Sequence, residues 1–184
     1  MKKWMLAGFV LAAMVAAPSA WSAGAKPVVV VVGATGRTGS AAVEQLVAQG
    51  AMRVRALVRD PSKPTTFGPS VEIAKGDLRD AASLGAALRG ATYVISAAGS
   101  HGDFFGDNRP ELVDYRGVRD LAVAAKAAGV KRVCLVSSMG VTHPEHPMNK
   151  AMNDIMSWKL KGENALRASG VSYTIVRPGG LRNE

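Results

Sequence analysis

From residue 27 onward, short apolar runs rich in β-branched residues alternate with alanine-rich stretches that have helical spacing. Six of these runs predict strands, at residues 28–33, 53–58, 71–76, 92–97, 132–137 and 172–177. Strands that alternate with helices are typical of βαβ units, which build a parallel sheet through right-handed crossovers. The pattern therefore predicts a single α/β domain with a doubly wound parallel sheet.

The stretches between the strands predict helices. Residues 37–49 place apolar side chains at helical spacing, and residues 111–129 and 156–170 each end in a glycine suited to a helix C-terminus. Residues 59–70 and 99–110 are rich in turn formers and follow two of the strands. Ligands of such sheets bind at the carboxyl ends of the strands, so we expect these two loops to flank a binding site.

Composition narrows the class of protein. The chain has 184 residues, of which 48% are hydrophobic and 20% are charged, as expected for one globular domain. Only 5% are aromatic, which argues against a stacking surface for nucleic acid. The net charge of +9 is scattered along the chain and predicts a solvated basic surface with no nucleic-acid partner. Cys134 lies in an apolar run and is expected to be a buried strand residue.

The first residues are typical of a targeting segment. Lys2 and Lys3 precede the apolar stretch 4–17, and Pro18 and small residues follow. This order predicts a secretory signal peptide within residues 1–25, followed by the domain at 26–184. The stretch is short for a membrane span, so an uncleaved N-terminal anchor is the alternative. We expect a periplasmic or secreted protein if the signal is cleaved, and a membrane-anchored one otherwise.

The strongest motif is a glycine-rich turn between the first strand and the first helix. Gly33 permits a tight turn, Gly36 lets a pyrophosphate approach the backbone, and Gly39 lets the helix pack on the strand. The helix N-terminus then offers unpaired N–H groups to phosphates. This context predicts a Rossmann-type dinucleotide site, to which we assign the loop residues Gly33, Thr35, Gly36, Arg37, Thr38 and Gly39.

The choice of cofactor depends on the end of the second strand, where an NAD enzyme places an acidic residue on the ribose hydroxyls. This chain has Arg59 there and adds Arg37 in the glycine loop. Two guanidiniums favour the 2′-phosphate of NADP(H). The next residue, Asp60, could instead bind the ribose, which leaves NAD(H) as the less favoured alternative.

The motifs GATGRTG, LVRD, KGDLRD, VISAAG, VKRVCLVSSMG and LRASGVSYTIVRPGGL together resemble the atypical short-chain dehydrogenases, the NmrA-like NAD(P)H-binding group. The resemblance covers nearly everything after the targeting segment. It implies that further residues contact the cofactor, namely Asp77, Leu78, Ala97, Ala98, Gly99 and Ser137. By residue type alone, Asp77 could equally cap a turn, and Ser137 could be a satisfied strand-end hydroxyl.

The resemblance also implies a catalytic group, and here the chain departs from the family pattern. Lys159 stands at the lysine of the family's Tyr-x-x-x-Lys pair, but Ile155 stands at the tyrosine and cannot donate a proton. Lys159 could bind the nicotinamide ribose or could be an exposed helix lysine. We name Ser138, Lys159 and Tyr115 as catalytic candidates, with Tyr115 as the possible replacement acid.

Two further features limit the interpretation. His143 and His146 flank Glu145, but neighbouring prolines predict a loop, so we expect no metal site. The chain ends soon after the sixth predicted strand, where relatives continue into a segment that lines the substrate pocket. The resemblance therefore predicts that this C-terminal substrate segment is absent, and the small-molecule substrate stays unknown.

Two functions are consistent with these residues. The first is an NADPH-dependent oxidoreductase that passes hydride to a flavin-like or quinone-like acceptor, because such acceptors can be protonated by solvent. The second is a non-catalytic dinucleotide-binding module that senses redox state or helps to assemble a complex. The missing tyrosine and the early end of the chain favour the second.

Overall fold

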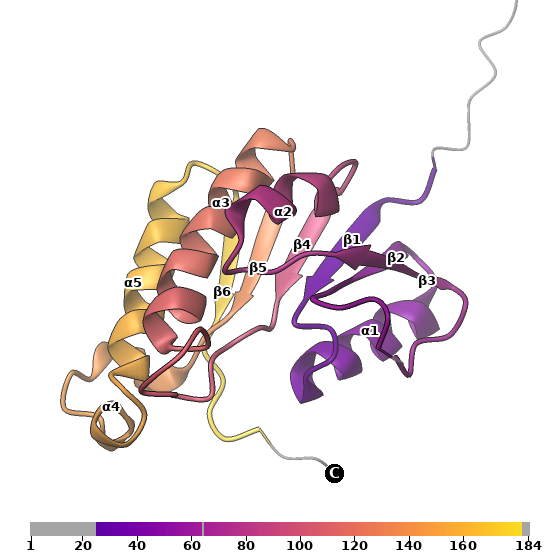
Figure 1. Cartoon of the computed structure of the whole chain (residues 1–184). Helices are drawn as coiled ribbons and strands as arrows, with labels where there is room; N and C mark the ends of the chain where they lie inside the picture. The colour runs from indigo at the N-terminus through magenta and orange to yellow at the C-terminus, as the bar shows by residue number, and fades with distance from the viewer. Residues whose placement is uncertain (1–24, 64, 182–184) are drawn as a thin grey trace, which may run out of the picture.

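The computed structural model describes residues 25–63 and 65–181, which form one six-stranded sheet with helices on both faces (Figure 1). The strands are β1 (Val28–Val32), β2 (Arg53–Val58), β3 (Val71–Lys75), β4 (Tyr93–Ser96), β5 (Arg132–Val136) and β6 (Tyr173–Val176). The α-helices are α1 (Arg37–Gln49), α2 (Ala81–Ala87), α3 (Val118–Ala127), α4 (Pro147–Ala151) and α5 (Ile155–Ala168). The predicted signal or anchor lies, except for its last residue, outside the described ranges.

The sheet is parallel throughout, in the order β3-β2-β1-β4-β5-β6. This order confirms the predicted doubly wound sheet, and all six strands lie within a residue of their predicted positions. The central strand β1 consists of five valines that are all buried, because helices cover it on both faces. Chain order reverses direction between β1 and β4, and a ligand site is expected at that point.

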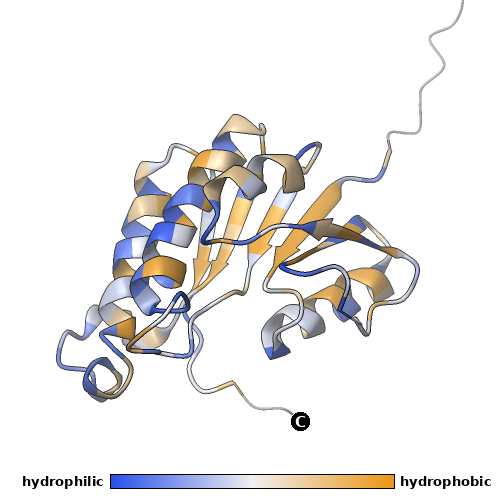
Figure 2. Cartoon of the chain, viewed as in Figure 1, coloured by the Kyte–Doolittle hydropathy of each residue, from blue (hydrophilic) through white to orange (hydrophobic). Residues whose placement is uncertain are grey.

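The sheet separates the apolar core into two layers, one on each face. Helices α2, α3 and α5 cover one face of the sheet, and their apolar side chains pack with Val30, Val94 and Val133 in the larger cluster. Helix α1 covers the other face beneath β1 and β2, where Val43 packs with Val29. Figure 2 shows the hydrophobic residues concentrated in the strands, with hydrophilic positions on the outer sides of the helices.

One segment differs from the helix predictions. The predicted helix at 111–129 begins as a π-helix, Glu111–Gly117, before α3 continues it. The contact with α5 is unusually close here, because a Cβ on Gly162 would lie 2.1 Å from the carbonyl oxygen of Asp114. Residues 143–146 form a loop, as predicted, between a 3₁₀ turn, Met139–Thr142, and the short helix α4, whose Met148 N–H donates to the His146 ring.

Within the described part of the chain, the helices are too short or too polar to cross a membrane.

Candidate functional site

The glycine turn lies between the carboxyl end of β1 and the first turn of α1. Gly33 has a φ of +77°, and a Cβ there would lie 2.6 Å from the backbone nitrogen of Ala98, so the turn packs directly against the end of β4. A Cβ on Gly39 would lie 2.0 Å from the Gly33 carbonyl oxygen, which leaves no space for a side chain between α1 and the turn. Both positions therefore require glycine for the backbone to close, as the fingerprint predicts.

The N-terminus of α1 has the properties of an anion site. Gly36 is its N-cap and provides no side-chain hydrogen bond, and the first helical turn contains no acidic residue. The first turn of a helix leaves backbone N–H groups unpaired and carries a partial positive charge. A phosphate placed there would satisfy these groups.

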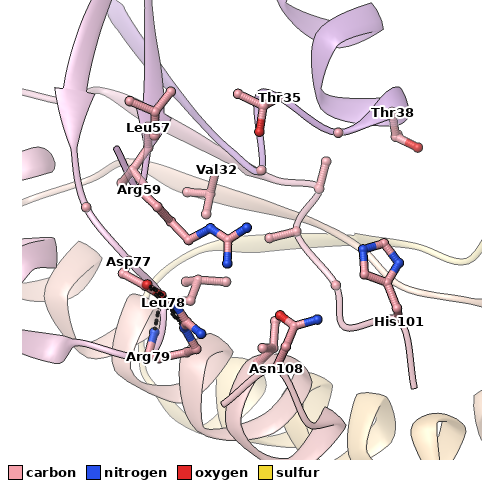
Figure 3. Close-up of a pocket in the computed structure, with 18 of the residues that line it drawn as sticks. Val32, Thr35, Thr38, Leu57, Arg59, Asp77, Leu78, Arg79, His101 and Asn108 are labelled. Atoms are coloured by element: carbon pink, nitrogen blue, oxygen red, sulfur yellow. Dashed lines mark hydrogen bonds and ion pairs between the residues drawn. The ribbon is translucent and has the colours of Figure 1, made fainter. Parts of the chain in front are cut away.

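A cavity of about 580 Å³ opens beside this helix end, over the carboxyl ends of β1, β2 and β4 (Figure 3). This volume lies in the usual range for small-molecule and cofactor sites. Eleven of the residues predicted to bind the cofactor line it: Gly33, Thr35, Gly36, Arg37, Thr38, Arg59, Asp77, Leu78, Ala97, Ala98 and Gly99. Gly39 lies behind the turn, and Ser137 is not among the lining residues.

The charge around the cavity is positive. Arg37, Arg59 and Arg79 line it, and Asp77 is the one acidic residue among the described lining residues. Figure 3 shows Arg59, Asp77 and Arg79 close to one another, with His101 and Asn108 farther along the cavity. Arg79 is bound to Asp77, whereas within residues 25–63 and 65–181 neither Arg37 nor Arg59 forms an ion pair.

Asp60, the residue that would favour NAD(H), is exposed, and its side chain forms hydrogen bonds within its own loop. Its carboxylate accepts hydrogen bonds from the backbone N–H of Ser62 at 3.0 Å and from the Ser62 hydroxyl at 2.6 Å. These bonds hold the pKa of Asp60 below its usual value. Asp60 does not line the cavity.

The three catalytic candidates lie outside the lining of this cavity. Lys159 is mostly buried, and its ammonium donates to the carboxylate of Asp114 at 2.6 Å. The side chain of Asp114 is 1% exposed and also accepts hydrogen bonds from the backbone N–H and the hydroxyl of Ser100. A Cβ on Gly99 would lie 3.2 Å from the Lys159 Nζ, so the ammonium lies just behind this lining residue. Lys159 is therefore a buried, paired lysine beside the cavity and not an exposed one.

Tyr115 stacks on Trp158, with ring centroids 6.0 Å apart, and Arg119 lies over its ring. Ile155 is 3% exposed and packs in a small apolar cluster with Val141 and Met156. The position of the family tyrosine is thus filled by an apolar core residue.

Ser138 is half-buried at the end of β5. The hydroxyl of its neighbour Ser137 is buried and lies near the Glu163 carboxylate, where it helps to lower the pKa of that group, although its geometry falls short of a hydrogen bond. Cys134 is half-buried in β5, and burial raises the pKa of its thiol. A raised pKa disfavours the reactive thiolate, in agreement with a structural role.

Sequence reasoning missed several lining residues, of which Arg79, His101 and Asn108 carry polar side chains. Arg79 stands in the motif GDLRD, two positions after Asp77, and the basic character already noted at Arg59 could have drawn attention to it. The loop 99–110, which carries His101 and Asn108, flanks the site as expected. It has no regular periodicity, so which of its side chains line the cavity follows only from the fold. The described residues contain no cluster of histidine, cysteine and acidic side chains that could hold a metal ion.

Glu163 joins α5 to the end of β6. It is fully buried, and its carboxylate accepts hydrogen bonds from Arg177 at 2.9 and 2.6 Å and from Arg167 at 2.8 Å. Burial alone raises the pKa of Glu163, but these hydrogen bonds outweigh it and hold the pKa below its usual value. This carboxylate fixes the strand end next to the helix that carries Lys159.

We predict that Glu163→Ala lowers the free energy of unfolding by about 3 kcal/mol, because it removes a buried group that pairs two arginines. The folded chain has the lower pKa, so the stabilisation is complete above the usual glutamate pKa and is lost as the pH falls through the folded value. Denaturant titrations between pH 3 and pH 7 measure both effects, with the exposed Glu145→Ala as a control. Equal stability of the two variants at neutral pH would contradict this role.

Comparison with known proteins agrees with this geometry. The profile described as NAD(P)H-binding matches residues 33–184. Sanguinarine reductase from Eschscholzia californica is 34% identical over 194 residues, with 86% of this chain and 71% of the reductase covered. Protein TIC 62 from Pisum sativum is 38% identical, with 83% of this chain covered but only 32% of that protein. An uncharacterised chloroplast protein from Arabidopsis thaliana is also 38% identical, and this chain spans about half of its length, 54%.

Solved structures of similar proteins also have this fold. A putative NAD-dependent epimerase/dehydratase from Bacillus halodurans is 31% identical and superimposes with a TM-score of 0.74, covering 86% of this chain and 72% of that one. An NADPH-dependent quinone oxidoreductase from Escherichia coli, solved with NADPH, is 26% identical with a TM-score of 0.65, covering 81% and 48%. The glycine turn, the cavity above it and these matches establish that the chain belongs to the NAD(P)H-binding family of Rossmann-fold proteins, as its resemblance to the atypical short-chain dehydrogenases implied.

Proposed function

We propose that this protein is an NADPH-dependent oxidoreductase that reduces a conjugated acceptor of the flavin or quinone type. The observation that carries the proposal is the cavity over the glycine turn, lined by three arginines and one paired aspartate. A dinucleotide in this cavity would place its pyrophosphate at the uncapped N-terminus of α1. The bound nicotinamide would supply the hydride.

The residues of the chain support NADPH over NADH. Arg59 and Arg37 supply guanidiniums at the end of β2 and in the glycine turn, where a 2′-phosphate would accept charge-assisted hydrogen bonds. Asp60 is held by Ser62, and Asp77 is held by Arg79, so both nearby carboxylates already have partners.

We predict that the protein binds NADPH about a hundredfold more tightly than NADH, because two charge-assisted contacts contribute about 3 kcal/mol. Arg59→Ala should remove most of this preference. Isothermal titration of both cofactors to the two proteins measures it, with Arg119→Ala, which changes an exposed arginine on α3, as the control. Equal affinities for NADPH and NADH in the unmodified protein would exclude the NADP assignment.

The proposal of a conjugated acceptor depends on the lack of a proton-donating side chain at the position of the family tyrosine. Ile155 is a core residue and Tyr115 is stacked on Trp158, so neither offers a proton to the cavity. A conjugated acceptor has no need of one, because solvent can protonate it. Two relatives are named as a sanguinarine reductase and an NADPH-dependent quinone oxidoreductase.

A second candidate function is a dinucleotide-binding module without catalysis. The observation that favours it is the Lys159–Asp114 pair, since the lysine that remains of the family's Tyr-x-x-x-Lys pair already has a buried partner. Oxidation of NADPH by the purified protein with an added quinone or flavin separates the two functions. Turnover supports the oxidoreductase, whereas tight binding without turnover on any acceptor supports the module.

A further inference from the structure

Among the described residues that line the cavity, Asp77 and Arg79 are the one carboxylate and guanidinium that form an ion pair. The backbone N–H and the Nε of Arg79 both donate to Oδ1 of Asp77 at 2.9 Å, and its terminal nitrogen donates to Oδ2 at 2.5 Å. The two side chains are 24% and 28% exposed, so the pair is partly shielded from solvent. Such bidentate pairs fix the orientation of the guanidinium plane.

The turn that holds this pair is itself fixed. The backbone N–H of Asp77 is in hydrogen-bond contact with the hydroxyl of Ser83 at 3.0 Å, and the N–H of Asp80 donates to the Asp77 carbonyl at 3.0 Å. Asp80 in turn caps α2. Arg79 is therefore presented to the cavity from a short, well-bonded turn between β3 and α2.

Arg59 reaches the same place from the end of β2. Hydrogen bonds from Arg79 hold the pKa of Asp77 below its usual value despite partial burial, and the charge of Arg59 adds to this effect. Asp77 is thus ionised at neutral pH, and its charge would repel a phosphate if Arg79 did not balance it. Figure 3 shows the side chains of Arg59, Asp77 and Arg79 grouped at one end of the cavity.

We propose that Arg79 is a specificity-determining residue that joins Arg37 and Arg59 around the 2′-phosphate of the dinucleotide and offsets the charge of Asp77. This inference rests on the proposed function and names how the same site selects its ligand. Arg79 acts in two ways: it offers a third guanidinium to the phosphate, and it neutralises the acidic side chain that would otherwise favour an unphosphorylated ribose.

The experiment compares two fragments of the cofactor that lack the nicotinamide, adenosine 2′,5′-bisphosphate and adenosine 5′-monophosphate. The quantity measured is the ratio of their dissociation constants in isothermal titrations. Arg79→Ala should lower the preference for the bisphosphate about tenfold, since a charge-assisted contact is lost and Asp77 is left unbalanced. Asp77→Asn should keep the preference or increase it, because Arg79 stays and a repelling charge goes.

Arg53→Ala is the matched control, because Arg53 also pairs with an acidic residue, Glu72, but at the amino end of β2, away from the cavity. It should leave the ratio unchanged. If Arg79→Ala does not fold by circular dichroism, Arg79→Gln tests the same loss of charge with a smaller change in packing.

An unchanged ratio in the Arg79 variants, with a clear preference in the unmodified protein, overturns this inference but leaves the proposed function standing. An equal loss in Asp77→Asn also overturns it, because the pair would then act only through the structure of the turn. If the unmodified protein binds neither fragment, the proposed function and this inference both fail.

Discussion

Gly36→Val is expected to reduce NADPH binding at least a thousandfold, to below detection in most assays, while the fold is retained. Gly36 lines the cavity at the N-terminus of α1, so a branched side chain there would fill the space in which a phosphate must approach the backbone. Its φ of −80° is allowed for any residue, and the one contact of an added Cβ is the Gly33 carbonyl oxygen at 3.3 Å. The cost to stability should be about 1 kcal/mol, as for other poor N-cap residues.

Gly39→Ala provides the contrast, because its smaller side chain has a larger structural effect. A Cβ at position 39 would lie 2.0 Å from the Gly33 carbonyl oxygen and 2.7 Å from its carbon, so α1 would have to move away from β1. We expect this variant to lose stability by several kcal/mol, in the range of other overpacked or strained core sites. Thermal melts and NADPH titrations of both variants separate the two effects. A Gly36→Val protein that binds NADPH normally would show that the glycine turn has only a structural role.

Turnover with a quinone is expected to exceed reduction of a simple ketone or aldehyde by about 10²- to 10⁴-fold, the usual contribution of a positioned acid. Carbonyl reduction needs a proton on the developing alkoxide, and Ile155 has none to give. Ile155 is buried with Val141 and Met156, so the residue at the position of the family tyrosine packs in the apolar core at the start of α5. The measurement is NADPH oxidation with each acceptor at equal concentration.

Tyr115→Phe is the control for this experiment. Because the Tyr115 ring stacks on Trp158 outside the cavity lining, we expect its hydroxyl to make no difference to either acceptor. Rapid carbonyl reduction that survives Tyr115→Phe would contradict the expectation, since it would require an acid elsewhere. Ile155→Tyr is a poor test, because a tyrosine would overpack the apolar cluster that Ile155 fills.

The sheet could be predicted from the sequence because each of its strands is a short, strongly apolar run. The five valines of β1 required two covered faces, and the glycine turn that follows fixed where the chain must bend. The cofactor side of the cavity could be predicted equally well, because its motif residues lie in the glycine turn and at the strand ends. The strands and the glycine turn are local features, so the spacing of residues in the sequence predicts them directly.

The remaining features depend on contacts between distant segments. Lys159 could be read as exposed or bound, and its partner Asp114 lies 45 positions earlier on a π-helical turn that no spacing predicted. The contact requires α5 to approach the π-helix Glu111–Gly117 at Gly162, and only folding brings these two segments together. For the same reason the individual residues His101 and Asn108 could not be assigned to the cavity in advance, although their loop could.

The placement of β1 at the centre of the sheet also determines how the chain can fold. On one side β1 pairs with β2, which follows it after a single helix, but on the other side it pairs with β4, which follows only after β3 and α2. The first three strands can therefore associate while the other edge of β1 still has no partner. Parallel pairings between distant segments form slowly, because the chain loses conformational entropy on loop closure before the new contacts stabilise it. The cavity spans this junction, so it is complete only when β1 has paired with β4.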